Sequence, residues 1–344
     1  MNAAPSSGYR APWWLPGGNL QTLYAPLLGR TPVAWTRKRW DTPDGDFIDV
    51  DFLPGAAEAP LVVLFHGLEG SSGSHYAVAL ALELGRIGWR CAVPHFRGCS
   101  GEPNRLPRAY HSGDAEEISW ILRRFRGESM RAPLYAVGVS LGGNALLKWL
   151  GGDRAANDVL DLAAAVSAPL DLMAAGDALG RGFNLVYARA FLQTMKQKSA
   201  QKLERFPGIF DGDAMRRSRT LREFDDVVTA PLHGFRNTDD YWTRASSKRV
   251  LGRIMLPTLL INARNDPFLP AAALPRIDEV SPVVRCEFSA EGGHAGFVSG
   301  RFPGHLRWLP QRLISFFREA SGTREIVTQR GANEIMTARN APPR

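Results

Sequence analysis

Short apolar runs alternate with helical patterns through most of the chain. Six runs of five or six residues resemble strands, and all but the last are mostly apolar. Buried strands that alternate with helices indicate a mainly parallel sheet covered on both faces, with right-handed crossovers. We expect the strands at 61–65, 90–94, 134–139, 162–166, 257–262 and 283–288, and the helices at about 74–87, 112–126, 141–151, 270–280 and 305–320. The predicted fold class is therefore α/β.

The N-terminal arm, residues 1–33, follows a different pattern. Leucines at helical spacing predict a short helix over 19–30, with Asn19 as its cap, Gly29 at its end and Pro26 distorting its interior. The stretch PWWLPGG just before it is too rich in proline and glycine to be helical. Two tryptophans and an apolar helix are compatible with a membrane surface. We expect instead that the arm packs on the chain's own domain.

The remaining pattern predicts the domain organisation. Residues 35–41 and 47–53 flank the turn TPDG and predict a hairpin at the start of the main domain, 34–320. About 90 residues without a clear strand separate the fourth and fifth runs of the sheet. We expect them to form a helical cap, at about 170–250, over the carboxyl edge of the strands. The polar segment 321–344 is expected to be a loosely ordered tail.

Composition and charge narrow the class of protein. The 344 residues carry a net charge of +8 and three cysteines, with no C-x-x-C pair. An odd number of distant cysteines argues against a disulfide framework or a zinc site and fits a reducing compartment. The start of the chain lacks the basic and apolar regions of a secretory signal, and no run approaches the roughly 20 apolar residues of a membrane helix. We therefore expect a cytoplasmic location.

The positive charge is concentrated between Arg181 and Arg222, where ten Lys or Arg stand against three Asp or Glu. We find no nucleic-acid-binding module beside this segment and expect no nucleic-acid partner. A solvated helical face is the favoured interpretation. Attraction to anionic lipid, as in peripheral membrane contact, or to an anionic substrate remains open.

The stretch VGVSLGGN places Ser140 between a predicted strand and a predicted helix. A serine at such a turn is presented at the edge of the sheet, and its neighbours must be nearly free of side chain. Gly138 and Gly142 meet this requirement, and Gly143 lets the helix approach closely. Because ligands bind beyond the carboxyl ends of parallel strands, we predict that Ser140 is a nucleophile rather than part of a small-residue turn.

A serine nucleophile needs a base and an acid that orients the base. His294, in a glycine-rich loop after the last strand, is the candidate base. Asp266, directly after the strand at 257–262, is the candidate acid, although a helix cap is its structural alternative. The chain order Ser140, Asp266, His294 is the order found in α/β hydrolases. Asp114 opens a helix and is better explained as a cap.

The tetrahedral intermediate of acyl transfer needs two preorganised hydrogen-bond donors. The backbone N–H of Leu141, directly after the nucleophile, is one candidate. The N–H of Leu68, in the loop HGLEGSSGS after the strand at 61–65, is the other. Cys99 has no obvious paired base and is expected to be a small packed residue rather than a reactive thiol. Phosphate-loop, dinucleotide-binding and H-E-x-x-H motifs are absent from the sequence, and we expect no cofactor or metal.

Several longer blocks resemble the YheT-type branch of the α/β-hydrolase superfamily, which includes eukaryotic lipid-hydrolysing relatives. They are PWWL with NLQTLYAPLL, HGLEGSSGSHY, FRGCSGEPNRLPRAYHSGD, GVSLGGNALLKWL, FDDVVTAPLHGF, DDYW, NDPFLP and GGHAGF. The resemblance covers about residues 12–317 and implies a serine hydrolase of carboxylic esters with Ser140, Asp266 and His294 as its charge-relay residues. One departure is Asn19, where the resemblance leads us to expect a histidine.

The expected function is therefore hydrolysis of a small ester or monoacylglycerol-like lipid through an acyl-enzyme. An amidase or thioesterase using the same three residues remains open, because these differ mainly in the leaving group. A non-catalytic binding protein on the same fold also remains open. Aromatic residues of the cap suggest an apolar acyl group, although core packing explains them equally well: Phe183, Tyr187, Phe191, Phe206 and Phe210. The oligomeric state is left unassigned.

Overall fold

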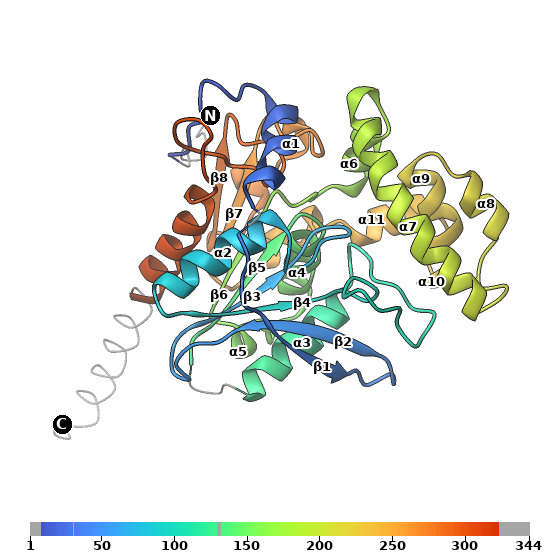
Figure 1. Cartoon of the computed structure of the whole chain (residues 1–344), viewed down its shortest axis with the longest axis horizontal. Helices are drawn as coiled ribbons and strands as arrows, with labels where there is room; N and C mark the ends of the chain where they lie inside the picture. Colours follow the sequence, from blue (N-terminus) through green and yellow to red (C-terminus); the bar gives the residue numbers. More distant parts are fainter. Residues whose placement is uncertain (1–7, 30, 129–131, 323–344) are drawn as a thin grey trace, which may run out of the picture.

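A computed structural model describes residues 8–29, 31–128 and 132–322, and one eight-stranded sheet runs through them (Figure 1). The strand order is β1-β2-β4-β3-β5-β6-β7-β8. β1 and β2 form the predicted hairpin, β2 also pairs antiparallel with β4, and the remaining pairs are parallel. The strands are β1 (Thr36–Asp41), β2 (Phe47–Leu53), β3 (Leu61–Phe65), β4 (Arg90–Pro94), β5 (Leu134–Val139), β6 (Leu162–Val166), β7 (Thr258–Ala263) and β8 (Val284–Ser289).

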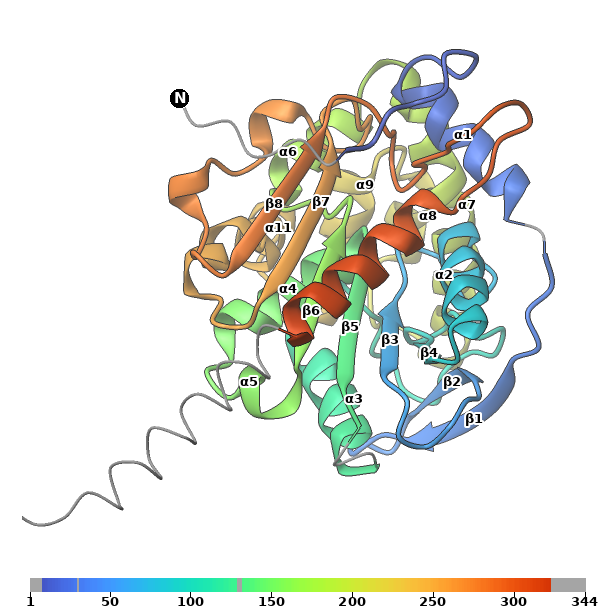
Figure 2. The ribbon, with the colours of Figure 1, turned by 90° about the vertical axis from the view of Figure 1, so that its left-hand side faces the viewer.

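The central strands are buried because helices cover both faces of the sheet. Every residue of β3, β5, β6 and β7 is buried, which explains their almost uninterrupted apolar sequences. Helices α3 and α4 contribute to the core on one face, whereas α2 and a final helix at 308–322 contribute to the core on the other (Figure 2). The bounds are α1 (Gly18–Leu28), α2 (His75–Arg86), α3 (Ala115–Glu128), α4 (Leu141–Gly152) and α5 (Ala156–Val159).

Between β6 and β7, residues 167–257 form a helical insertion that projects to one side of the sheet in Figure 1. Part of it has a small core of its own, formed by Leu192, Phe210, Met215, Phe224 and Val228. Its elements are α6 (Leu172–Leu179), η1 (Gly182–Asn184), α7 (Leu185–Arg205), α8 (Gly212–Arg217), α9 (Leu221–Phe224), the π-helical turn η2 (Asp225–Thr229), α10 (Ala230–Leu232), α11 (Thr238–Ala245) and η3 (Lys248–Arg253).

Two local predictions are wrong. The helix expected at 270–280 is replaced by two single 3₁₀ turns, η4 (Ala271–Ala273) and η5 (Ile277–Glu279). Pro275 stands between them and cannot donate a helical hydrogen bond. Asn19 does not cap α1, which begins after Gly17 without a side-chain cap.

The apolar face of α1 is exposed to solvent instead of packing against the core. The side chains of Leu20, Leu23 and Leu27 are exposed, at 52%, 44% and 52%, while Gln21 and Ala25 of the same helix are completely buried. Helical spacing therefore located the helix but not the direction in which its leucines point. The reason is that the polar side of α1 satisfies backbone groups of neighbouring loops, as described below.

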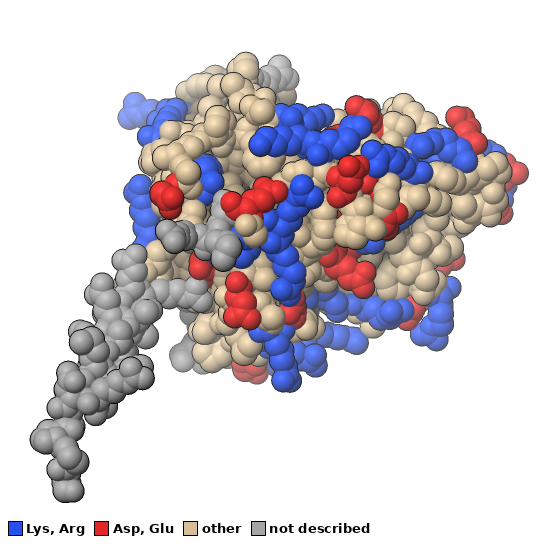
Figure 3. All heavy atoms as spheres, turned by 90° about the horizontal axis from the view of Figure 1, so that it is seen from below, with Lys and Arg blue, Asp and Glu red and all other residues tan. Residues whose placement is uncertain are grey.

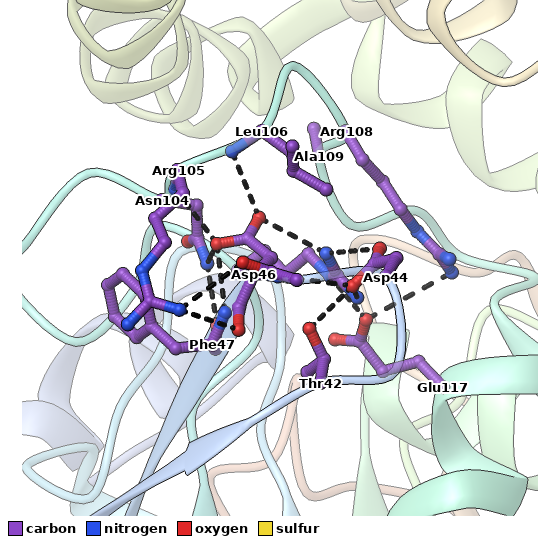
Figure 4. A network of polar contacts seen from close by, with 12 residues as sticks. Thr42, Asp44, Asp46, Phe47, Asn104, Arg105, Leu106, Arg108, Ala109 and Glu117 are labelled. Atoms are coloured by element: carbon purple, nitrogen blue, oxygen red, sulfur yellow. Dashed lines mark hydrogen bonds and ion pairs between the residues drawn. The ribbon is translucent and has the colours of Figure 1, made fainter.

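A buried ionic network fixes the loop 95–111 to the β1–β2 hairpin (Figure 4). The guanidinium of Arg97 contacts the carboxylates of Glu117 at 2.6 Å, Asp44 at 2.9 Å and Asp46 at 3.1 Å. Asp46 also accepts a hydrogen bond from the side chain of Asn104 at 2.9 Å. Burial raises the pKa of Glu117 to about 7, in spite of this guanidinium. The loop is therefore held from several sides, and it forms one wall of the cavity described next.

Much of the basic face of α7 is used within the molecule. Lys198 forms an ion pair with Glu69 at 2.8 Å. Lys202 and Arg205 donate to backbone carbonyl groups within 104–108, at distances of 2.5 to 3.1 Å. Burial lowers the pKa of Lys202 to about 8. On the face seen in Figure 3, Lys and Arg are interspersed with Asp and Glu.

Candidate active site

Ser140 lies at the turn between the end of β5 and the start of α4, as the motif predicts. Its backbone has a φ of 53°, in the left-handed region that non-glycine residues seldom adopt. Its N–H donates to the carbonyl of Val166 on the neighbouring strand at 2.9 Å. A Cβ on Gly138 would lie 2.5 Å from the carbonyl oxygen of Gly142, and one on Gly142 would lie 2.4 Å from that of Phe65. Both flanking positions therefore require glycine for space.

The three residues predicted from the ends of separate strands come together. His294 Nε2 lies 2.9 Å from Ser140 Oγ, and His294 Nδ1 lies 2.9 and 3.1 Å from the two carboxylate oxygens of Asp266. Asp266 is buried directly after β7 and also accepts the N–H of Phe268 at 2.8 Å. The ring of Phe268 stacks on the imidazole with centroids 4.1 Å apart. The hydrogen bonds to Asp266 and the stacked ring restrict the orientation of the imidazole.

The loop that carries His294 is held by side chains from distant parts of the chain. The His294 N–H donates to Thr22 Oγ1 of α1 at 2.8 Å. The next residue, Ala295, has a φ of 52° and donates its N–H to Ser167 Oγ at 2.9 Å. The Gly293 N–H donates to the side chain of Asn265 at 3.0 Å. The polar side of α1 thus takes part in positioning the candidate base.

Gln21, one residue earlier on α1, is completely buried and joins several segments. Its side-chain oxygen accepts from the Gly292 N–H at 2.8 Å and from Asn265 Nδ2 at 3.0 Å. Its amide nitrogen donates to the carbonyl of Leu15 at 3.0 Å and to the Glu291 carboxylate at 3.3 Å. Neither Gln21 nor Thr22 was predicted from the sequence to be part of the site. The signal in the sequence is a pair of adjacent polar residues within a mainly apolar helix.

The loop after β3 also lies beside Ser140 and is held there by two hydrogen bonds. The Gly142 N–H donates to the carbonyl of His66 at 3.1 Å, so the loop after β3 lies against the start of α4. The Gly67 N–H donates to Tyr76 at 2.8 Å. Among the described residues, the N–H groups of Leu68 and Leu141 have no protein acceptor, and both residues line the cavity with Ser140 and His294.

His66 helps to set the direction of the peptide between Gly67 and Leu68. Its Nε2 accepts the Phe96 N–H at 3.0 Å, which leaves Nδ1 as the donor to the carbonyl of Gly67 at 2.8 Å. Burial lowers the pKa of this imidazole to about 3, so it is neutral at physiological pH. The carbonyl of a peptide points away from its N–H. The hydrogen bond between His66 and the Gly67 carbonyl therefore also orients the N–H of Leu68, which belongs to the same peptide group.

Glu69, the next residue, has a φ of 56° and is held by two elements. The hydroxyl of Tyr110 accepts the Glu69 N–H at 2.9 Å and donates to the Glu69 carboxylate at 2.8 Å. Lys198 of α7 contacts the other carboxylate oxygen. The helical insertion is thereby connected to the loop that contains Leu68. Neither Tyr110 nor Lys198 was singled out from the sequence.

A cavity of about 540 Å³ opens at Ser140 and His294 and extends between the sheet and the helical insertion. Its mainly apolar wall includes Leu141, Leu172, Leu179, Phe191 and Trp242. Of the five aromatic residues proposed for this role, Phe191 and Phe206 line the cavity, whereas Phe210 lies in the core of the insertion and Phe183 is half exposed.

Four smaller findings concern other expectations. Asp114 accepts the N–H of Glu117 at 3.3 Å at the start of α3, which confirms its role as a cap. Cys99 is half-buried, and burial raises the pKa of its thiol to about 11, which disfavours the reactive thiolate. Within residues 8–29, 31–128 and 132–322, no group of three or more His, Cys, Asp or Glu side chains could hold a metal ion. In the same residues, no helix is both long and apolar enough to cross a bilayer.

Comparison with known proteins decides the family. Residues 60–300 match the family model described as the alpha/beta hydrolase fold. The chain belongs to the α/β-hydrolase family. It is 41% identical over 303 residues to YheT of Escherichia coli (strain K12), a protein named for esterase activity, with 86% of this chain and 88% of YheT covered. The resemblance to the YheT branch is therefore confirmed, as is the predicted fold class.

Other relatives carry lipid-hydrolase names. Human phospholipase ABHD3 is 30% identical over 314 residues, which cover 88% of this chain and 76% of that protein. A monoacylglycerol lipase of Saccharomyces cerevisiae is 26% identical over 269 residues, which cover 75% of this chain and 59% of that protein. Among solved structures, the esterase EaEST of Exiguobacterium antarcticum shares the fold with a TM-score of 0.52 and 18% identity, covering 82% of this chain and all of that one.

Proposed function

We propose that this α/β hydrolase cleaves carboxylic esters, with Ser140 as nucleophile, His294 as general base and acid, and Asp266 as the residue that orients His294. The observation that carries the proposal is the continuous hydrogen-bonded chain from Ser140 Oγ through both imidazole nitrogens to the buried carboxylate. It lies at the opening of a mainly apolar cavity. Relatives that carry esterase and lipase names support the same chemistry.

The first half of the reaction forms an acyl-enzyme. Ser140 Oγ attacks the ester carbonyl carbon while His294 Nε2 takes the hydroxyl proton. The carbonyl oxygen becomes an oxyanion that accepts the N–H groups of Leu68 and Leu141, whose direction is fixed before substrate arrives. The intermediate then breaks the bond to the alcohol oxygen. His294 gives its proton to that oxygen, and the acyl group remains on Ser140.

The second half repeats these roles with water as nucleophile. His294 takes a proton from water as the oxygen attacks the acyl carbon, and Leu68 and Leu141 again stabilise the oxyanion. Collapse of this intermediate releases the carboxylic acid and returns the proton to Ser140. Asp266 holds Nδ1–H throughout and stabilises the imidazolium through its negative charge. No step needs a cofactor.

The proposed substrates are short-chain esters or monoacylglycerol-like lipids. The apolar wall formed by Leu172, Leu179 and Phe191 would accept the acyl chain, because its burial there removes apolar surface from water. The phospholipase and monoacylglycerol lipase names of relatives support a lipid-like acyl group. A panel of 4-nitrophenyl esters of increasing acyl length, with matched thioesters and anilides, separates ester from thioester or amide preference.

The decisive test is labelling with a fluorophosphonate probe. The wild-type protein should be labelled stoichiometrically, Ser140→Ala not at all, and His294→Ala at a rate lower by at least about 10³-fold. Cys99→Ser is the matched control for nonspecific labelling and should react like the wild type. Equal labelling of wild type and Ser140→Ala would contradict the proposal, because another residue would then be the nucleophile. No labelling of a folded wild type would also contradict it and would favour a non-catalytic binding protein.

A further inference from the structure

The solvent-facing positions of α1 are apolar. Leu20, Leu23, Pro26 and Leu27 are exposed, whereas Gln21 is completely buried. A surface helix in a globular protein normally has the reverse arrangement, with its apolar stripe toward the core. Here the inner side is used to bond the loops around His294. The exposed leucines are therefore available to a partner outside the described chain.

Two aromatic side chains extend this surface. Trp13 is 91% exposed and Phe302 is 74% exposed. They belong to one surface because Trp14 packs against both Tyr24 of α1 and Phe302, with ring centroids 5.4 Å apart in each pair. The loop that carries Phe302 lies beside α1 in Figure 2. We call this surface the exposed apolar patch, formed by Trp13, Leu20, Leu23, Pro26, Leu27 and Phe302.

The two segments that form the patch contain basic side chains but no acidic ones. Residues 8–29 and 292–318 contain no Asp or Glu. Arg10 and Arg301 are exposed within them, and neither has a carboxylate partner in the described part of the chain. On the side of the molecule away from α1, by contrast, acidic and basic side chains are mixed (Figure 3). Arg307 and Arg312, farther along the second segment, pair with Glu83 and Glu287. The patch therefore combines apolar anchors with two arginines, Arg10 and Arg301, that have no carboxylate partner among the described residues.

We propose that the exposed apolar patch docks this protein on the surface of an anionic lipid bilayer. Leucine, tryptophan and phenylalanine can insert at the boundary between headgroups and acyl chains, while flanking arginines contact anionic headgroups. A second copy of the chain fits less well. Face-to-face patches would bring Arg10 and Arg301 of both copies together with no carboxylate from these segments. The proposal does not rest on the proposed ester hydrolysis.

Docking in this way would place the bilayer close to the triad. Thr22, on the inner side of α1, holds the backbone of His294. At the other edge of α1, Asn19 accepts the hydroxyl of Tyr187 at 3.1 Å. The half-exposed Phe183 packs against Tyr187 at the start of the helical insertion, which extends the apolar surface toward the cavity. A lipid-like molecule that leaves the bilayer would therefore meet this side of the protein first.

The test is co-sedimentation of the full chain with phosphatidylcholine vesicles that contain about 30% phosphatidylglycerol. We expect the wild type to bind, and the triple variant Trp13→Ser/Leu23→Ser/Leu27→Ser to bind at least 10-fold more weakly. Met255→Ser/Ile277→Ser removes two apolar side chains outside the patch that are at least as exposed as Leu23 and Leu27, and it should bind normally. Circular dichroism and hydrolysis of a water-soluble ester show whether each variant is folded, and Ser140→Ala should bind like the wild type.

Charge variants test the lipid class. Arg10→Gln/Arg301→Gln should weaken binding to the anionic vesicles several-fold, and Arg217→Gln/Arg219→Gln, which removes equal charge elsewhere, should not. Vesicles of phosphatidylcholine alone should bind the wild type weakly. The proposal is overturned if the folded wild type does not bind anionic vesicles, or if the triple variant binds as well as its control. It is also overturned if the patch variants abolish a dimer of the chain while vesicle binding is unchanged.

Discussion

Thr22 accepts a hydrogen bond from the backbone N–H of His294 at 2.8 Å across 272 residues of sequence. The same hydroxyl donates to the carbonyl of Gly18 at 2.7 Å, so its orientation is fixed by the helix that carries it. The N-terminal arm is therefore a structural part of the candidate active site. Its contribution can be measured separately from that of the triad.

Thr22→Ala should lower kcat by about tenfold and leave KM nearly unchanged, because a loosened His294 loop misplaces the base after substrate has bound. Loss of both hydrogen bonds of the hydroxyl should cost about 1–2 kcal/mol of unfolding free energy. Thr22→Ser keeps the hydroxyl and should recover most of kcat. The measurement is ester hydrolysis across a range of substrate concentrations. Equal kcat values for the alanine and serine variants would contradict this role.

Tyr110→Phe should lower kcat by roughly tenfold, which is less than the roughly 10²–10³-fold cost of removing an oxyanion donor outright, because the Leu68 N–H is only displaced. The variant removes the hydroxyl that holds both the N–H and the carboxylate of Glu69, directly after Leu68. Lys198→Met is the comparison, because it removes the partly exposed ion pair and a long contact with Cys99 but leaves the Tyr110 hydroxyl in place, so it should have a smaller effect. If Lys198→Met were the more damaging change, the support for Leu68 would come from α7 rather than from Tyr110.

Gly138→Ala should destabilise the protein by about 1–3 kcal/mol and abolish fluorophosphonate labelling. Its Cβ would lie 2.5 Å from the Gly142 oxygen and 2.6 Å from Gly143 Cα, which are backbone atoms of the turn around Ser140. Gly152 lies at the end of α4, the helix that follows Ser140, and a Cβ there would meet no atom within 4 Å, so Gly152→Ala should be neutral or slightly stabilising. Denaturant unfolding compares the two variants, and similar losses in both would show that the turn is not the cause.

The stability that three buried histidines contribute should fall as the pH drops from about 6.5 toward 4, whereas the raised pKa values of the buried Glu117 and Asp225 act in the opposite direction. Burial lowers the pKa of His66 to about 3 and the pKa values of His75 and His111 to about 4. The native chain therefore keeps these imidazoles neutral, while the unfolded chain binds protons below about 6.5 and is favoured by acid. Each group can contribute a slope of up to about 1.4 kcal/mol per pH unit.

The variant His75→Gln isolates one of these groups. The imidazole of His75 donates from Nε2 to the carbonyl of Ala295 at 2.9 Å, and a glutamine amide can replace that donor without titrating. Denaturant unfolding between pH 4 and 7 should show a pH dependence reduced by nearly one proton. His305→Gln, which changes an exposed histidine, is the control. An unchanged slope in His75→Gln would show that His75 does not remain neutral in the native state.

The sequence alone determined the framework and the three candidate residues of the triad. Alternating apolar strands and helices predicted the sheet, because buried parallel strands need apolar side chains on both faces. The glycines around Ser140 were recognisable because the turn leaves no space for a Cβ. Asp266 and His294 were found because parallel strands place their carboxyl ends at one edge, so residues distant in sequence meet there.

Only the tertiary structure decided how α1 is oriented and what supports the site. Helical spacing shows which side chains share a face but not which face is covered. In α1 the buried face is the one whose Gln21 and Thr22 satisfy backbone N–H groups of the loop at 292–294. Hydrogen bonds between distant segments leave no periodic signal in a sequence. The supports at Tyr110, His66 and α1 therefore became visible only when the folded chain brought these segments together.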